Sequence, residues 1–311
     1  MIFPTVQASE GSFAFFREKV YNAVICDGRM NGMLFLILAV LASSVLAIVL
    51  KYLSSGYTYG VYLVNYVTCA LLAFLTMKPR SLWNGDPFPL WLGVVSGFLY
   101  LAALVVYAYS IRKNGAVLSS VFTRLGVLVP VLVSVVLFGE RPTVLQCAGI
   151  AVAIAAAVVM NGLPKKDKKQ GVAGAMSLGV LLLTLLFNGS ADSMSKIFTQ
   201  LGSRQDDGLF MFYIFLFAGL FTLVLLLREK QKLTRRDLIF GVLVGVPNFF
   251  SSRLLLAALT ELPAFFVYPC YSVGAILVIS CASFVLFREK LQRRQLCAVG
   301  MILVALVLLN L

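Results

Sequence analysis

The sequence contains no histidine and few charged residues. Histidine is absent from all 311 residues, and Asp, Glu, Lys and Arg together make up 13%. Imidazole is a common general base and metal ligand, so its absence excludes hydrolases and phosphotransferases that depend on it. Soluble domains are about a quarter charged, whereas here 60% of the residues are hydrophobic and the mean hydropathy is +0.95. The composition therefore indicates a polytopic membrane protein.

Motifs for metal binding and for nucleotide hydrolysis are also missing. The 6 cysteines show no paired CxxC spacing, and we interpret them as small packing residues rather than ligands or a disulfide framework. No GKS/T loop is present to power an ATP-driven pump. We expect neither a metal nor another cofactor.

Ten apolar stretches make up most of the chain. They cover about 33–50, 59–77, 90–111, 115–138, 143–160, 172–199, 208–227, 238–259, 264–286 and 295–310. Most approach the ~20 residues that a membrane-spanning helix needs. A lysine-rich link at 162–171 divides them five and five. Because each half has an odd number of spans, the second half is expected to be inverted in the membrane.

The two halves repeat each other at a spacing of 149 residues. Glu140 falls on Glu289 and Gln146 falls on Gln295, in register and without gaps. Apolar coincidences are common in such a chain, but matched polar residues are not. The pattern therefore indicates an internal duplication.

The sequence around this repeat resembles a known transporter family. An apolar helix, the Gly139–Glu140 break, a Gln six residues after the Glu and a small-residue helix are similar to the closing hairpin of the drug/metabolite transporter (DMT) superfamily, EamA-like branch. The segments 107–110, 114–116 and 124–125 add to the likeness, which covers about 33–310. The second copy departs from the pattern at Arg288 and Ala298, where the first copy has glycine. The resemblance implies a membrane transporter rather than an enzyme.

We predict an all-α polytopic membrane protein with ten transmembrane helices, arranged as two inverted five-helix repeats. The predicted segments are an N-terminal tail at 1–31, a first repeat at 32–161, a basic linker at 162–171 and a second repeat at 172–311. The tail shows no signal-peptide pattern, and either an interfacial helix or a frayed end fits it. We expect the plasma (inner) membrane of a bacterium as the location.

The net charge of +13 resides mostly in the loops. Loops after the odd-numbered spans carry more than twice as many Lys and Arg residues as the N-terminal segment and the other loops together. The positive-inside rule then places both termini outside, whereas the family resemblance implies both inside. We interpret the charge as a topology signal, so no nucleic-acid partner is expected.

Polar residues within the spans are the candidates for a binding site, because burying them in lipid is costly. Helical spacing groups them on faces that are expected to meet around one cavity. The predicted substrate-binding residues are Tyr62, Asn65, Tyr66, Ser120, Arg124, Asn188, Asp192, Asn248, Ser251, Tyr268 and Tyr271.

Four charged residues lie well inside the spans: Arg124, Asp192, Lys196 and Arg253. Arg124 has no acid one helical turn away, and we predict that it binds the substrate. Asp192 is the predicted carrier of a coupling proton, while an ion pair with Lys196 is the alternative. Arg253 lies off the polar face of its span, and we interpret it as structural.

Glu140 and Glu289 occupy matching helix breaks in the two halves. A carboxylate at such a place can accept hydrogen bonds from free N–H groups at the start of a helix. We predict that each glutamate caps the helix that follows it, as a structural rather than a binding residue.

Three basic residues against one acid in the spans favour an anionic or zwitterionic solute, such as an amino acid or organic acid. We predict a secondary active transporter working by alternating access. An organic-cation or drug exporter with a tyrosine cage is one alternative. A membrane-embedded enzyme or lipid-handling protein is another, although a paired acid–base set is missing. The expected partners are the solute, the bilayer and a coupling proton or ion, and both a monomer and a homodimer fit.

Overall fold

The computed structural model describes residues 32–53, 59–77, 85–114, 119, 122–123, 125–161 and 172–287, together with 297, 300–301, 304–305 and 307–308. The predicted tail at 1–31, the linker at 162–171 and three predicted functional residues, Ser120, Arg124 and Glu289, lie outside the described residues.

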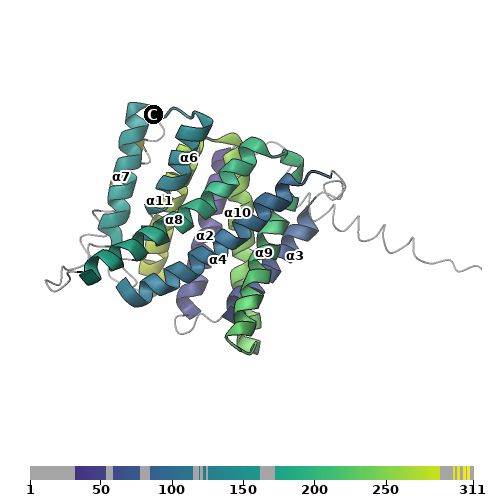
Figure 1. Ribbon diagram of the computed structural model, residues 1–311. Coiled ribbons are helices and arrows are strands. Elements are labelled where there is room, and N and C mark those ends of the chain that lie inside the picture. The colour runs from purple at the N-terminus through teal and green to yellow at the C-terminus, as the bar shows by residue number, and fades with distance from the viewer. Residues whose placement is uncertain are drawn as a thin grey trace, which may run out of the picture.

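The described chain is a bundle of α-helices with one short 3-10 helix (Figure 1). The first half contributes α2 (Gly32–Leu53), α3 (Tyr59–Thr76), α4 (Phe88–Asn114), α6 (Leu128–Phe138) and α7 (Val144–Asn161). The second half contributes α8 (Val172–Leu201), η2 (Arg204–Asp206), α9 (Asp207–Arg228), α10 (Arg235–Glu261) and α11 (Ala264–Phe287).

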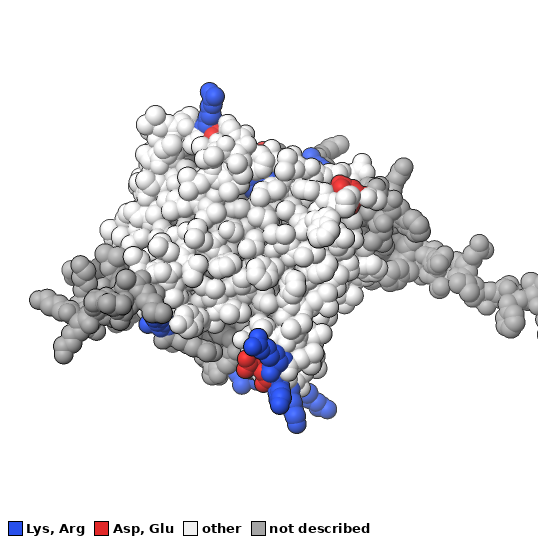
Figure 2. Space-filling view, viewed as in Figure 1, with Lys and Arg blue, Asp and Glu red and all other residues white. Residues whose placement is uncertain are grey.

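Within the described residues, five stretches of helix are long and apolar enough to cross a bilayer: Tyr59–Thr76, Phe88–Ser110, Leu178–Leu201, Arg204–Arg228 and Arg235–Glu261. Charged side chains gather at the two ends of the bundle and leave a band between them nearly free of charge (Figure 2). These features confirm an all-helical membrane protein. The number of ten helices is not confirmed, because the tenth predicted span is described only at scattered residues.

The fourth predicted span is not one continuous helix. A turn at Gly126–Val127 separates α6 from the helical residues before it. Pro130 has no N–H to donate to the Gly126 carbonyl, which instead accepts from the Val129 N–H at 3.0 Å. Proline explains the break, a feature that the hydropathy of this stretch does not reveal.

Glycines allow close helix packing between the halves. Gly93 and Gly97 of α4 face α9, and Gly241 and Gly245 of α10 face α3. Both pairs have the four-residue spacing that lets membrane helices approach closely. The third helix of each half therefore packs on the second helix of the other half.

Each of the largest contacts that a helix of the first half makes with the second half has an equivalent contact made by the corresponding helix of the second half with the first. α4 packs on α8 as α10 packs on α2, and α6 packs on α8 as α11 packs on α2. Two repeats related by a two-fold axis give this pattern. Among the described helices, the principal contacts of the first half are all with the second half. The packing supports an architecture of two repeats that interlock.

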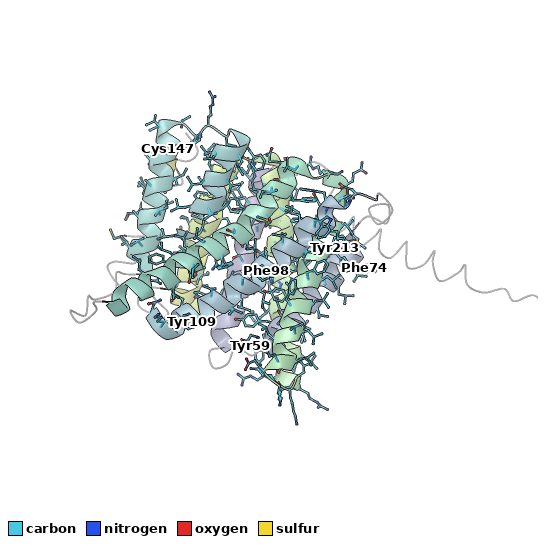
Figure 3. All side chains as sticks on the ribbon, in the orientation of Figure 1. Tyr59, Phe74, Phe98, Tyr109, Cys147 and Tyr213 are labelled. Carbon is cyan, nitrogen blue, oxygen red and sulfur yellow. The ribbon has the colours of Figure 1, made fainter. Side chains whose placement is uncertain are left out.

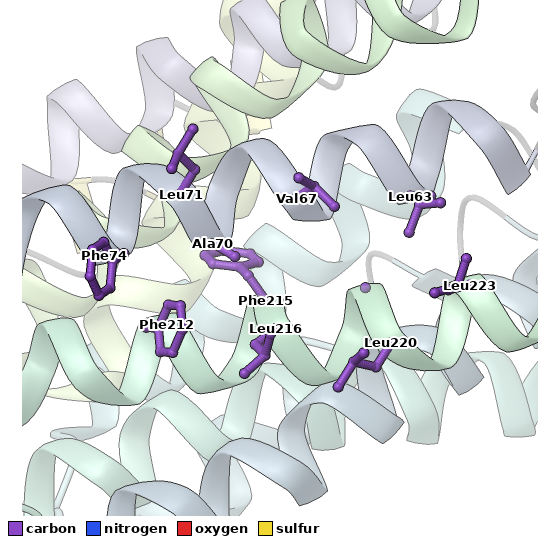
Figure 4. A pocket seen from close by; sticks show the side chains of 11 residues that line it. Leu63, Val67, Ala70, Leu71, Phe74, Phe212, Phe215, Leu216, Leu220 and Leu223 are labelled. Carbon is purple, nitrogen blue, oxygen red and sulfur yellow. The ribbon is translucent and has the colours of Figure 1, made fainter. Parts of the chain in front are cut away.

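A groove of about 320 Å³ runs between α3 and α9 (Figure 4). Its walls are apolar and include Leu63, Val67 and Leu71 of α3 and Leu216 and Leu220 of α9. Phe74 of α3 and Phe212 of α9 line the groove and are in ring contact, and Phe212 also contacts Tyr213; Figure 3 labels Phe74 and Tyr213 on the ribbon. Val67 is 55% exposed and Leu71 57% exposed, as expected of a lipid-facing surface rather than a polar binding site.

Candidate functional site

Polar residues of α3 and α10 meet in the interior between the halves. The Asn248 Nδ2 donates to the Asn65 Oδ1 at 3.1 Å. The Cys69 thiol lies 3.2 Å from the Gly245 carbonyl oxygen, to which it donates. Asn65 is buried at 3% exposure. Two predicted site residues that are 183 positions apart in sequence are thus in direct contact.

A second polar contact joins α2, α10 and α11. The Ser251 Oγ lies 2.7 Å from the Tyr271 OH and donates to the Ala39 carbonyl oxygen at 3.3 Å. Ser251 has one hydroxyl proton, so when it donates to Ala39 the Tyr271 hydroxyl donates to Ser251. Ser251 of α10 thus fixes the direction of the Tyr271 hydroxyl, which α11 contributes.

Asp192 of α8 lies among tyrosines from other helices. The Tyr268 hydroxyl of α11 donates to the Asp192 backbone carbonyl. The Asp192 carboxylate is close enough to interact electrostatically with Tyr268 and with Tyr100 of α4, which also interacts with Tyr66 and Tyr271. Helices of both halves thus bring a carboxylate and four phenol groups into one region.

Tyr100 is a candidate that the sequence interpretation missed. It lies in an apolar run of α4, between Leu99 and Leu101. Its ring is 6.4 Å from that of Phe215 in an edge-on contact, so one side packs against α9. A signal was available, because Ser96 and Tyr107 lie on the same helical face, at i−4 and i+7.

The other predicted site residues are placed less centrally. The Asn188 side chain donates within its own helix, to the Thr184 carbonyl at 2.8 Å. Tyr62 is partly buried and packs beside the apolar cluster that includes Tyr66 and Phe215. The structure therefore joins Asn65 with Asn248 and Ser251 with Tyr271, while Asn188 uses part of its amide on its own backbone.

Lys196 pairs with Glu140. The Lys196 Nζ lies 2.6 Å from the Glu140 Oε1, and the side chains are 1% and 14% exposed. Lys196 belongs to the second half and Glu140 to the break between α6 and α7 in the first. The sequence offered Asp192, on the same helix, as the acidic partner of Lys196 and gave no indication of Glu140.

Glu140 caps a helix, but not the one that was predicted. Its Oε1 accepts from the Ala264 N–H at 3.2 Å and its Oε2 from the Phe265 N–H at 3.3 Å, at the start of α11. The left-handed conformation of Gly139, with φ of 67°, ends α6 and redirects the chain just before Glu140. The glutamate therefore reaches across to the other half.

The start of α7 has its own cap. The Thr143 Oγ1 accepts from the Gln146 N–H at 3.2 Å, and the Gln146 Oε1 accepts from the Thr143 N–H at 2.9 Å. This reciprocal pair is a capping box. Gln146, which has a matching Gln in the second copy, thus caps the helix that Glu140 was predicted to cap.

The charge count of the spans also changes. The Arg253 Nη1 lies 3.9 Å from the Asp207 Oδ2, and both side chains are 14% exposed, which agrees with a structural interpretation of Arg253. Glu140 and Asp207 come from helix ends that the sequence count left outside the spans. Lys196 and Arg253 therefore have acidic neighbours. With Glu140 and Asp207 added to Asp192, the three basic residues are matched by three acidic ones, so the inferred excess of positive charge disappears.

Among the residues that the structure describes, no three Cys, Asp or Glu side chains gather closely enough to hold a metal ion. The fold and the buried polar contacts define a polytopic membrane protein whose two interlocking halves enclose polar side chains.

Comparison with known families gives this class a name. The profile of the EamA-like transporter family matches residues 30–162 and 175–311, one copy for each half. The chain belongs to the EamA-like transporter family, within the DMT superfamily, and this family consists of membrane transporters rather than enzymes.

The fold is also found in a solved structure described only as "Crystal structure of protein". The two share 13% sequence identity with a TM-score of 0.71, and the match covers 89% of this chain and 95% of that chain. At this identity the likeness shows the fold alone. No curated protein matches the sequence.

Proposed function

We propose that the protein is a secondary active transporter that moves a small zwitterionic metabolite, such as an amino acid, across the membrane by alternating access. The observation that carries this proposal is the position of the Asp192 carboxylate near Tyr100 and Tyr268, in the region where both halves contribute polar groups. A carboxylate and aromatic rings together attract an ammonium group.

The negative end of the solute is assigned to Arg124 from the sequence. A guanidinium binds a carboxylate through two parallel hydrogen bonds, and such bonds are stronger where water is partly excluded. Of the basic residues inside the spans, Lys196 and Arg253 have acidic neighbours. This leaves Arg124 as the best candidate for a contact with the solute.

An organic cation is the second candidate solute. It is favoured by Tyr100 and Tyr268, which interact with Asp192, and by Tyr66 and Tyr271, which interact with Tyr100. Aromatic faces bind cations that have no carboxylate. The two candidates differ only in whether the solute also needs a negative group, and therefore in whether Arg124 takes part.

Alternating access is supported by the exchange of equivalent contacts between the halves, because two-fold related repeats are a transporter architecture. Asp192 is the proposed coupling residue. We place the protein in the plasma membrane of a bacterium, as a monomer or a homodimer.

Flux into liposomes tests the proposal with three matched solutes: an amino acid, the amine that lacks its carboxylate and the acid that lacks its amine. We expect uptake of the first alone, and reduced uptake by Tyr271→Phe. Tyr109→Phe is the control, because Tyr109 is 52% exposed at the far end of α4 (Figure 3). Uptake of the amine alone would favour the organic-cation candidate. Chemical conversion of the solute without its movement would refute transport.

A further inference from the structure

The contact at Glu140 joins one side chain of the first half to two elements of the second. The Glu140 carboxylate accepts hydrogen bonds from the first two residues of α11 and pairs with Lys196 near the end of α8. Cys147, just beyond this break, and Tyr109, near the end of α4, lie at opposite ends of the bundle (Figure 3). The contact therefore lies towards one end of the bundle.

Three electrostatic partners meet at this point. The carboxylate lies between the Lys196 ammonium and the N-terminus of α11, which carries partial positive charge from its free N–H groups. Lys196 is 1% exposed, and its Nζ lies 5.9 Å from the centre of the Phe138 ring. A buried ammonium needs an opposite charge close to it. If Glu140 and Lys196 separate, each charge therefore needs another partner or contact with water.

Other contacts between the halves are of a different kind. α4 and α9 meet through glycines and apolar side chains, and α3 and α10 meet through glycines and uncharged contacts such as the Asn248–Asn65 hydrogen bond. Such surfaces tolerate small sliding movements. The charged contact at Glu140 is directional, and it breaks completely over a short separation.

We propose that Glu140 and Lys196 form a latch that holds the two halves together at this end of the bundle. Opening of the substrate region towards this end requires the Glu140 carboxylate to leave both Lys196 and the start of α11. The proposal rests on alternating access as the transport mechanism and adds the residues that control one of its two openings. The structure represents the state in which this end is latched.

A second ion pair near the same end provides a matched control. The Arg204 Nη2 lies 3.0 Å from the Glu261 Oε1, with exposures of 68% and 37%. Both residues belong to the second half, and Glu261 lies only three residues before Ala264. Glu261→Gln breaks this pair and removes one charge near the same end, but it removes no contact between the two halves.

A distance measurement across the halves tests the latch. Spin labels are attached to cysteines introduced at Val144 of α7 and Gln200 of α8, in a full-length protein whose native cysteines are replaced. Val144 is 86% exposed and Gln200 is exposed. Distance distributions are recorded in lipid nanodiscs for the parent protein and for Glu140→Gln, Glu140→Gln with Lys196→Met, and Glu261→Gln.

We expect the parent and Glu261→Gln to give the same main distance. Glu140→Gln and the double variant gain a longer-distance population, because the ion pair between the halves is gone. The double variant is the deciding one, since it leaves no buried unpaired lysine that would by itself prevent folding. A folded double variant with the parent distribution would overturn the latch and leave Glu140 as a helix cap only.

This measurement is independent of the solute. Absence of any flux in the parent protein would argue against the proposed function while leaving the distance result intact. A normal flux with unchanged distances in the double variant would argue against the latch alone.

Discussion

The packing of α4 on α9 leaves no room for a methyl group at Gly97. A Cβ placed there would lie 2.7 Å from the Phe217 Cβ, 2.8 Å from the Ala218 backbone N and 3.0 Å from the Ile214 carbonyl oxygen. Ordinary contacts of this kind lie at 3.4–4 Å. Two of the three neighbours are backbone atoms, so Gly97→Ala has to push the helices apart.

The expected cost follows from this geometry. Overpacking of a well-packed interior destabilises by about 1–3 kcal/mol, which lowers the ratio of folded to unfolded protein about 5- to 150-fold. Alanine is also the better helix former by up to about 1 kcal/mol, and this gain has to be separated from the steric cost. Gly179→Ala separates it, because a Cβ at Gly179 of α8 meets nothing within 4 Å.

Reversible unfolding in mixed micelles, followed by circular dichroism, gives the free energy of each variant. We expect Gly97→Ala to be about 1–3 kcal/mol less stable than Gly179→Ala. Gly245→Ala in α10 is expected to match Gly97→Ala, since a Cβ there would lie 2.7 Å from the Thr68 Cβ and 3.0 Å from the Asn65 carbonyl oxygen. Equal stability of the Gly97 and Gly179 variants would refute the packing argument.

Three further substitutions address the site. Asp192→Asn is expected to remove proton-driven uptake and to spare counterflow exchange, and an unchanged pH dependence of uptake would contradict the coupling role. Arg124→Gln is expected to abolish uptake in a protein with a normal gel-filtration profile, with partial rescue by Arg124→Lys, because losing one partner of such a contact costs about 2–5 kcal/mol. Recovery of a misfolded Arg124→Gln protein by neutralising Asp192 would instead show an ion pair. Tyr271→Phe removes the 2.7 Å contact with Ser251 and is expected to lower stability by about 1 kcal/mol, whereas a loss equal to that of Tyr109→Phe would show that this contact does not stabilise the fold.

Hydropathy predicted several helices closely because lipid imposes a length and an apolar composition on each span. The predicted span at 59–77 corresponds to α3, Tyr59–Thr76, and the span at 208–227 to α9, Asp207–Arg228. The break at Gly139–Glu140 was also predicted. The turn at Gly126–Val127 was not, because an apolar run stays apolar whether or not proline interrupts its hydrogen bonds.

The partners of the charged residues were beyond the reach of one sequence. Helical spacing relates residues three or four positions apart, so it offered Asp192 as the neighbour of Lys196. Glu140 lies much further away in the chain, and only the fold brings it within 2.6 Å. The same limit applies to Asp207 beside Arg253. The sequence could assign a polar face to a single helix, but it could not show which faces of different helices contact each other.

The interlocking of the halves also shapes how the chain is made. Because the principal contacts of α2, α3, α4, α6 and α7 are all with second-half helices, a ribosome that has finished the first half has produced helices without their packing partners. Residues 175–311 must still be synthesised, which takes on the order of ten seconds at typical rates of elongation. During that interval the glycine faces of α4 meet lipid or other helices instead of α9. The first half therefore reaches its final packing only after the second half has been inserted beside it.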